Sequence, residues 1–224
     1  MVCHLLKLKL VAFDMDGTLV KDPSSWTRIH RHFGVERSAR NNMPLYETGK
    51  IDYEEFMRRD IALWPRELHV KDIDLVFSDY SLDPDARKVT ARIRQLGYHI
   101  AIVSAGLDLL ANKIAKALGL TSVVANGLQT DNRGYLTGRG VFRVDPLHKD
   151  IALETLLRDI GITLNECMSV GDSKYDSTFL QRAAFGVAVG SDPVLARVAT
   201  HVIDDLSELI PFVESLGPKP ASSS

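Results

Sequence analysis

The sequence predicts an α/β fold, with a parallel β-sheet core and a small helical cap inserted after the first strand. Short apolar runs typical of buried strands alternate with helical patterns along most of the chain, whereas one long stretch contains helical patterns only. The length of 224 residues suits one large domain or one domain with an inserted module. We therefore expect an α/β core formed by residues 1–20 and 84–216, a helical cap at 21–83 and a disordered tail at 217–224.

The helices between the expected strands have recognisable end signals. One helix begins at Asp83-Pro84 and ends at Gly97, and two later helices end at Gly119 and Gly161. Strands that are separated by such helices pair in parallel through right-handed crossovers. The expected strands cover about 8–14, 98–104, 121–125, 167–171, 186–189 and 200–203.

Two regions differ from this alternation. In the cap, Asp52 and Glu55 have the spacing of a capping box, which predicts a helix from there to about Trp64. Between residues 129 and 144, a turn-rich segment at 131–134 separates two short extended runs. This pattern predicts a β-hairpin.

The composition excludes several classes of protein. Hydrophobic residues make up 45% of the chain and charged residues 25%, as in ordinary soluble globular proteins. The 27 basic against 29 acidic residues leave no basic excess for nucleic acid or an anionic membrane, and no apolar run approaches the roughly 18 residues of a membrane span. Cys3 and Cys167 match no metal-binding spacing, and Cys167 is expected to be a buried free thiol. This usage fits a reducing compartment, so we expect a cytoplasmic protein.

The tract most informative about chemistry is Val11–Thr18, where an apolar strand ends in two aspartates, a glycine and a threonine. Side chains alternate faces along a strand, so Asp14 and Asp16 are expected to point into one shared site. Two carboxylates held so close repel each other, and one must be protonated or a cation must lie between them. The alternative is a plain strand end in which Asp16-Gly17 forms a turn.

Polar residues also follow two other expected strands, at the edge of a parallel sheet where ligands bind. The segment Ser104–Gly106 comes directly before a helix, so a hydroxyl and backbone N–H groups are available for a phosphate, unless Ser104 only caps the helix. Asp172 and Asp176 follow a later strand and suit a hard cation such as Mg²⁺. Asp176 also fits an ordinary helix cap.

In chain order these groups form a constellation of Asp-x-Asp at 14–16, Ser104, Lys149 and Gly-Asp-x-x-x-Asp at 171–176. Lys149 alone would be interpreted as a solvated surface charge, but the ordered set resembles the haloacid dehalogenase superfamily of phosphatases. The resemblance implies a Rossmann-like core that covers nearly the whole chain. It also implies Mg²⁺ as the cofactor and a small phosphorylated metabolite as the substrate.

The resemblance implies a role for each matching residue. Asp14 would attack phosphorus and carry an aspartyl-phosphate, and Asp16 would protonate the leaving alcohol and then deprotonate the attacking water. Lys149 would restrain Asp14 and neutralise phosphate charge. The other implied roles are phosphate binding by Thr18, Ser104, Ala105 and Gly106, Mg²⁺ binding by Asp172 with Asp14 and the backbone carbonyl of Asp16, and support of the metal by Asp176.

Within this superfamily the chain looks most like the phosphoserine phosphatase branch, for example in the runs Gly49–Phe56 and Val103–Asp108. The residues that would read the amino-acid part of the substrate differ from that branch. Asp60 aligns where the branch has a carboxylate-binding arginine, and an aspartate there would repel a substrate carboxylate. Phosphoserine stays a candidate substrate, with its recognition residues altered. Further departures from the branch lie at Gly17, Pro23 and Tyr175.

Other polar and aromatic side chains of the cap have ordinary expected roles. Trp26 belongs to an apolar series with helical spacing and is expected in the core. His30 and His32 are expected at the surface, because no metal-binding spacing accompanies them. Arg28 and Arg58 are expected in exposed salt bridges rather than on an anionic substrate.

The sequence leaves one alternative function open, a phosphotransferase or phosphomutase that uses the same aspartyl-phosphate but excludes water. A carbon–halogen hydrolase is disfavoured, because that chemistry has no leaving alkoxide for Asp16 to protonate. A non-catalytic binding protein would be expected to have a damaged motif, whereas every chemistry-bearing position is intact. The sequence indicates neither the physiological substrate nor the oligomeric state.

Overall fold

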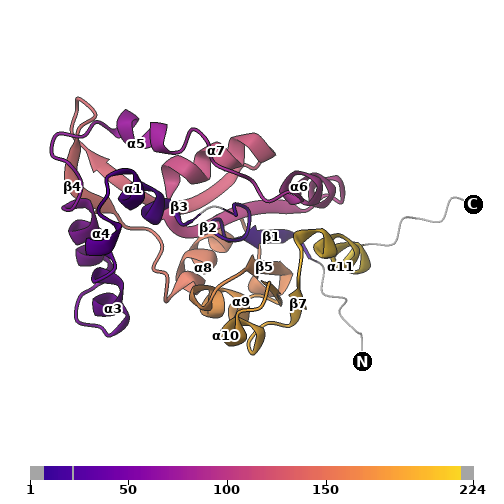
Figure 1. Cartoon of the computed structure of the whole chain (residues 1–224). Helices are drawn as coiled ribbons and strands as arrows, with labels where there is room; N and C mark the ends of the chain where they lie inside the picture. The colour runs from indigo at the N-terminus through magenta and orange to yellow at the C-terminus, as the bar shows by residue number, and fades with distance from the viewer. Residues whose placement is uncertain (1–7, 22, 218–224) are drawn as a thin grey trace, which may run out of the picture.

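The computed structural model describes residues 8–21 and 23–217. Cys3 and the expected disordered tail beyond residue 217 lie outside this range. The described chain contains one seven-stranded sheet in the order β4-β3-β2-β1-β5-β6-β7 (Figure 1). The strands are β1 (Leu10–Phe13), β2 (His99–Leu107), β3 (Ser122–Thr130), β4 (Leu136–Val141), β5 (Cys167–Gly171), β6 (Phe185–Val189) and β7 (His201–Ile203).

The pairing of the strands confirms the predicted α/β fold. Every neighbouring pair is parallel except β3 and β4, which form the expected hairpin. The hairpin turn is closed by the Asp131 N–H, which donates to the carbonyl of Tyr135 at 2.8 Å. Strand β3 begins at Ser122 and continues into the hairpin, so it is longer than the sequence predicted.

The sheet lies between two layers of helices, and β1 shows why. Val11 and Phe13 belong to one buried cluster, whereas Leu10 and Ala12 belong to another, because successive side chains of a strand point to opposite faces. Cys167 is buried as a free thiol in the second cluster, as predicted. Helices α6 (Ala86–Gln95), α7 (Asp108–Leu118) and α11 (Leu209–Leu216) cover the first face, and α8 (Lys149–Asp159), α9 (Ser177–Arg182) and α10 (Pro193–Ala196) cover the second.

The described part of residues 21–83 contains helices and no named strand, and it lies beside one end of the sheet (Figure 1). Asp52 caps α4, because its side chain accepts the Glu55 N–H. Glu55 does not complete the predicted capping box, since its carboxylate pairs with Arg58 and Arg59 instead. The division into core and cap stays a prediction. The helices of this region are α1 (Ser25–His32), α2 (Glu36–Ala39), α3 (Asn42–Glu47), α4 (Tyr53–Ile61) and α5 (Val70–Val76).

The β3–β4 hairpin packs against these helices as well as extending the sheet. A Cβ added to Gly140 of β4 would lie 2.6 Å from the sulfur of Met57 on α4, so a glycine permits this close approach. The hairpin also exchanges backbone hydrogen bonds with the segment before α5, from the Leu136 N–H to the carbonyl of Leu68 at 2.9 Å. None of the described helices has the length and the apolar composition that a membrane span requires.

Candidate active site

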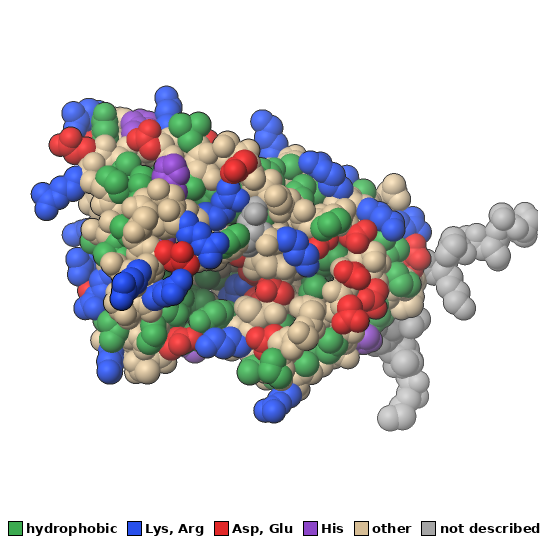
Figure 2. All heavy atoms as spheres, in the orientation of Figure 1, with side chains coloured by type: hydrophobic (Ala, Val, Ile, Leu, Met, Phe, Trp, Pro, Cys, Tyr) green, Lys and Arg blue, Asp and Glu red, His purple; other side chains and the backbone are tan. Residues whose placement is uncertain are grey.

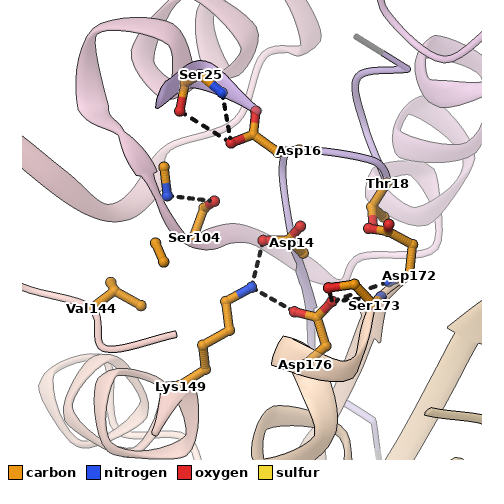
Figure 3. Close-up of polar contacts among 12 residues, drawn as sticks. Asp14, Asp16, Thr18, Ser25, Ser104, Val144, Lys149, Asp172, Ser173 and Asp176 are labelled. Atoms are coloured by element: carbon orange, nitrogen blue, oxygen red, sulfur yellow. Dashed lines mark hydrogen bonds and ion pairs between the residues drawn. The ribbon is translucent and has the colours of Figure 1, made fainter. Parts of the chain in front are cut away.

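The carboxyl ends of β1, β2 and β5 lie next to one another at one edge of the sheet. In register, Phe13 of β1 is opposite Ile102 of β2 and Val170 of β5. Asp14 directly follows β1, and Asp172 directly follows β5. The topology therefore brings together the residues that the sequence predicted for one site (Figure 3).

Lys149 lies at the centre of this group. It is only 3% exposed, and its Nζ is 2.5 Å from Asp14 Oδ1 and 2.5 Å from Asp176 Oδ1 (Figure 3). Burial lowers the pKa of Lys149, but the two carboxylates outweigh this effect and hold the pKa above its ordinary value. Lys149 is therefore a fixed buried cation, and the surface-charge interpretation of this lysine is wrong.

Asp176 links Lys149 to the turn after β5. Its second oxygen, Oδ2, accepts the N–H groups of Asp172 and Ser173, each at 3.1 Å. Gly171 allows this contact, because an added Cβ there would lie 2.5 Å from Asp176 Cγ. Asp176 thus stabilises the turn before α9 and contacts Lys149, whereas its side chain makes no capping hydrogen bond to α9, as a plain helix cap would.

Asp172 is held from the other side by the segment after β1. Thr18 Oγ1 donates to Asp172 Oδ1 at 2.8 Å. Gly17 has a φ of 94°, and an added Cβ would lie 2.2 Å from Asp172 Oδ2, so only glycine fits here. The Thr18 hydroxyl is engaged with Asp172 in this structure, and its predicted contact with a phosphate stays a prediction.

Three carboxylates form a group that fits a metal ion. Ligand oxygens of Asp14, Asp172 and Asp176 all lie within 4.8 Å of one another. Burial, together with the charges of neighbouring aspartates, raises the pKa of Asp14 to about 6 and that of Asp172 to about 7, whereas Lys149 acts in the opposite direction. An all-oxygen donor set short of positive charge suits a hard divalent cation. The carboxylate of Asp16 is not part of this group.

Asp16 turns away from Lys149 toward the start of α1 (Figure 3). Its Oδ2 accepts the N–H and the hydroxyl of Ser25, each at 3.1 Å, and its Oδ1 is buried without a hydrogen-bond partner among the described residues. Burial, followed by the nearby charge of Asp14, raises the pKa of Asp16 to about 7. The two aspartates therefore contact different partners, and Asp16 is suited to exchange a proton near neutral pH.

Ser104 does not cap a helix. Strand β2 continues to Leu107, and α7 begins only at Asp108, so the predicted strand end at residue 104 is wrong. The Ser104 hydroxyl accepts the Gly106 N–H at 3.2 Å, which folds the strand locally. The carbonyl of Ala105 accepts hydrogen bonds from Trp26, Tyr53 and Asn126.

Similarity to known proteins agrees with this arrangement of residues. A family model described as haloacid dehalogenase-like hydrolase matches residues 8–184. The chain belongs to the haloacid dehalogenase-like hydrolases. Its motifs at residues 14–16, 104 and 149 and at 171–176 all lie within the matched range.

Several relatives of this hydrolase are phosphoserine phosphatases. The protein of Methanocaldococcus jannaschii is 29% identical over 212 residues, which cover 93% of this chain and 99% of that protein. The protein of Archaeoglobus fulgidus is 29% identical over 85% of this chain, which spans about half (55%) of that relative. A solved phospho-aspartyl intermediate analogue of phosphoserine phosphatase is also similar, with a TM-score of 0.77, 29% identity and coverage of 92% of this chain and 99% of that chain. The predicted resemblance to a phosphatase of this family is confirmed.

The hydrolase has a cleft of about 770 Å³ between this group of residues and helices α1 to α4. Figure 2 shows a hollow on the face in view, with lysine or arginine side chains beside it. Asp14, Asp16, Lys149 and Asp172 line the cleft together with Ser104, Ala105 and Gly106. Thr18 and Asp176 do not line the cleft, but they contact Asp172 and Lys149, which do. The predicted catalytic residues and the helical region thus enclose one space.

The cap residues that the sequence left undecided occupy different places in the hydrolase. Arg28 donates to Asp79, and Arg58 donates to Glu55, and neither arginine lines the cleft. Asp60 lines the cleft and is 2% exposed. His32 is exposed as predicted, but His30 is 4% exposed and lines the cleft, so its predicted surface position is wrong. The reason is a buried partner, Asp60, thirty residues away in the sequence.

Three contacts that the sequence did not predict connect α3 to the core of the hydrolase. Glu47 Oε1 accepts hydrogen bonds from Lys174 Nζ and from the Tyr175 hydroxyl, each at 2.7 Å. The hydroxyl of Tyr46 donates to Asp145. Tyr175 is one of the departures from the phosphoserine phosphatase branch, and that departure was the only signal in the sequence. Ser25, the partner of Asp16, gave no signal beyond its place next to a helix N-cap.

Proposed function

We propose that this hydrolase is a Mg²⁺-dependent phosphomonoesterase that cleaves a small phosphorylated metabolite through an aspartyl-phosphate intermediate. The observation that carries the proposal is the contact between Asp14 and Lys149, because it aims a buried carboxylate at the cleft beside a permanent positive charge. A carboxylate approaches a phosphate dianion only when nearby positive charge offsets the repulsion. The similarity to an aspartyl-phosphate analogue of a phosphoserine phosphatase supports the same intermediate.

In the first step, an Asp14 oxygen forms a bond to phosphorus while the bond from phosphorus to the ester oxygen breaks. Asp16, which has a pKa of about 7, donates its proton to the departing alkoxide, and Asp16 becomes a carboxylate. In the second step, Asp16 takes a proton from a water molecule, whose oxygen attacks phosphorus and releases Asp14 and inorganic phosphate. One residue thus serves as acid and then as base.

The remaining residues of the site bind and orient. Lys149 holds Asp14 in place through their ion pair and stays charged throughout, since its pKa is raised. Ser104, Ala105 and Gly106 line the place where the phosphate oxygens would lie. Asp14 and Asp172, with the backbone carbonyl of Asp16, would hold Mg²⁺, which neutralises phosphate charge when bound. Asp176 supports this set by fixing both Lys149 and the backbone of Asp172.

The test is phosphate release from p-nitrophenyl phosphate and a panel of metabolite phosphates, with Mg²⁺ present or removed by a chelator. We expect the substitution Asp14→Asn to lower kcat by at least about a thousandfold, because amide nitrogen and oxygen do not attack phosphorus. The control Asp159→Asn changes an exposed aspartate of α8 and should leave kcat unaltered. Undiminished release in strong chelator would contradict the metal role, and full activity of the Asp14 variant would contradict the nucleophile.

The same experiment separates hydrolysis from phosphoryl transfer. Acceptor alcohols added to the reaction should not divert phosphate into new esters if water is the physiological acceptor. Transfer to an alcohol in preference to water would favour the phosphotransferase or phosphomutase alternative. The predicted cytoplasmic location and the core and cap boundaries also stay predictions.

A further inference from the structure

The inner wall of the cleft contains a buried carboxylate, Asp60, with two neutral partners. Asp60 Oδ2 is 2.9 Å from His30 Nε2, and Asp60 Oδ1 accepts a hydrogen bond from Asn42 Nδ2 at 2.6 Å. His30 Nδ1 in turn accepts the indole N–H of Trp64 at 3.1 Å. His30 of α1, Asn42 of α3 and Trp64 after α4 therefore hold Asp60 in one position.

The contact with Trp64 determines the charge of His30. An indole N–H can only donate, so His30 Nδ1 is an acceptor and has no proton. The single ring proton is on Nε2, where it is donated to Asp60, and the imidazole is neutral. Among the described residues, no lysine or arginine forms an ion pair with Asp60. The network therefore orients a negative charge beside the cleft without neutralising it.

Asp60 also has unused capacity to accept hydrogen bonds. An ionised carboxylate offers about four lone-pair positions, and the two protein donors occupy two of them. A buried charge that lacks an opposite charge is costly, and a cation that enters the cleft would recover part of that cost. The free lone-pair positions of Asp60 suit a hydrogen-bond donor, whereas a substrate carboxylate at this position would meet a like charge.

Aromatic rings complete the same wall. Trp26, Tyr53 and Phe56 line the cleft, with the centroids of Trp26 and Phe56 6.2 Å apart and those of Tyr53 and Phe56 5.1 Å apart. The polar ends of Trp26 and Tyr53 both donate to the carbonyl of Ala105, so these residues offer ring surface to a ligand. Aromatic faces attract cations and do not attract carboxylates.

The arginines that line the cleft do not reverse this preference. Arg31 and Arg40 are both exposed, and both pair with Glu36, which also lines the cleft. Glu47 also lines the cleft, and it pairs with Lys174. Of Glu36, Glu47 and Asp60, only Asp60 has no lysine or arginine partner among the described residues. The acidic and aromatic part of the cleft is therefore the wall at Asp60.

We propose that Asp60 and the aromatic wall select phosphate monoesters whose leaving alcohol carries an ammonium group and no carboxylate. This inference rests on the proposed phosphomonoesterase function and names its substrate class. The ammonium group donates to Asp60 and lies against the rings of Trp26 and Phe56, while the phosphate is held at Asp14. His30, Asn42 and Trp64 are positioning residues that act through Asp60.

The test compares three related esters in the wild-type enzyme, two of which have equal size. O-phosphoethanolamine has the ammonium group alone, O-phosphoserine adds a carboxylate, and 2-hydroxyethyl phosphate replaces the ammonium group by a hydroxyl. We expect kcat/KM for O-phosphoethanolamine to exceed the values for the other two esters by at least about tenfold. The carboxylate of O-phosphoserine is repelled by Asp60, and 2-hydroxyethyl phosphate lacks the ammonium group. An equal or higher kcat/KM for O-phosphoserine would overturn the inference.

A substitution at Asp60 tests whether this residue causes the preference for the ammonium group. Asp60→Asn should reduce the ratio between O-phosphoethanolamine and 2-hydroxyethyl phosphate to about twofold or less, whereas Glu54→Gln, an exposed change on the same helix, should leave the ratio unchanged. A ratio that persists in folded Asp60→Asn protein would contradict the role of Asp60. If this variant does not fold, the comparison of the three esters in the wild type still decides the question.

The design separates failure of this inference from failure of the proposed function. Hydrolysis of p-nitrophenyl phosphate without the expected preference would overturn the inference alone. If no ester is hydrolysed, the proposed function fails, and calorimetric binding of the same three esters to the Asp14→Asn protein then tests the preference. Tighter binding of O-phosphoethanolamine would support the inference, and binding of O-phosphoserine with equal affinity would overturn it.

Discussion

At the scale of single residues, Ser25 contacts Asp16, the proposed acid–base residue. Its N–H and hydroxyl both donate to Asp16 Oδ2 and oppose the burial that raises the pKa of Asp16 to about 7. The substitution Ser25→Ala removes one of these bonds, so the pKa of Asp16 should rise further. We expect the alkaline limb of the kcat/KM profile to move to higher pH and kcat to fall about tenfold, because Asp16 becomes a stronger base that gives up its proton less readily. A pH–rate profile measures both effects.

The neighbouring serine provides the control for this prediction. Ser24 caps α1 by accepting the Thr27 N–H at 3.2 Å, so Ser24→Ala should destabilise the protein by about 1 kcal/mol without moving the alkaline limb. Ser25→Ala should also lower the melting temperature, since the buried Leu107 N–H loses its acceptor. An identical pH profile in both variants would show that Ser25 does not act on Asp16.

At the scale of elements, α3 and the turn after β5 form a latch across the cleft. The latch consists of Glu47, Lys174 and Tyr175, and the hydrogen bond from Lys174 followed by that from Tyr175 lowers the pKa of Glu47. The change Tyr175→Phe removes one bond worth about 0.5–1.5 kcal/mol. We expect KM to rise about two- to tenfold while kcat stays equal or increases, because an open cleft holds substrate less tightly and releases product sooner.

Steady-state kinetics on two variants distinguishes the latch from a general effect of losing a hydroxyl. Tyr135→Phe changes a half-exposed tyrosine of the hairpin and should leave KM and kcat at wild-type values. Because Lys174 is half exposed, high salt should weaken its pair with Glu47 and raise KM further in the Tyr175 variant. A fall in kcat at constant KM would instead place Tyr175 in the chemical step.

The positions of the helices and strands could be predicted better than the contacts of their side chains. Apolar runs and glycine stops are local signals, so β1, α7 and α8 lie close to where the sequence placed them. The end of β2 was misplaced because Ala105 and Gly106 carry little strand signal, and only pairing with Asn126 of β3 reveals the extension. His30 was misplaced because its partner Asp60 is far away in the sequence.

The candidate site was predictable for a related reason. Asp14, Asp16 and Asp172 follow strands, Lys149 begins α8 and Ser104 lies near the end of β2, so the order of the elements brings them to one edge of the sheet. Whether a hydroxyl such as that of Thr18 faces a phosphate or a neighbouring carboxylate depends on contacts between distant segments. No local pattern contains that information.

At the scale of the whole molecule, the buried carboxylates of the site lower the stability of the folded protein when they are ionised. In the absence of metal, the pKa values of Asp14, Asp16 and Asp172 are raised from 3.8 to about 6, 7 and 7, first of all by burial. Between about pH 4 and pH 7 the folded protein therefore binds more protons than the unfolded chain, so its stability falls as the pH rises through this window and is lowest above it. Lys149 does not oppose this trend, because it stays protonated throughout.

We therefore expect the melting temperature in chelator to be lower at pH 8 than at pH 5, and Mg²⁺ to restore most of the loss at pH 8. Binding to the folded state alone adds about 2.7 kcal/mol when free Mg²⁺ is a hundred times its dissociation constant. The substitution Asp172→Asn removes one largely buried charge and one proposed metal ligand, so it should raise the melting temperature in chelator at pH 8 and abolish the effect of Mg²⁺. Asp159→Asn should change neither. An increase in metal-free stability from pH 5 to pH 8 would mean that the three aspartates do not control the balance of charge in the folded protein.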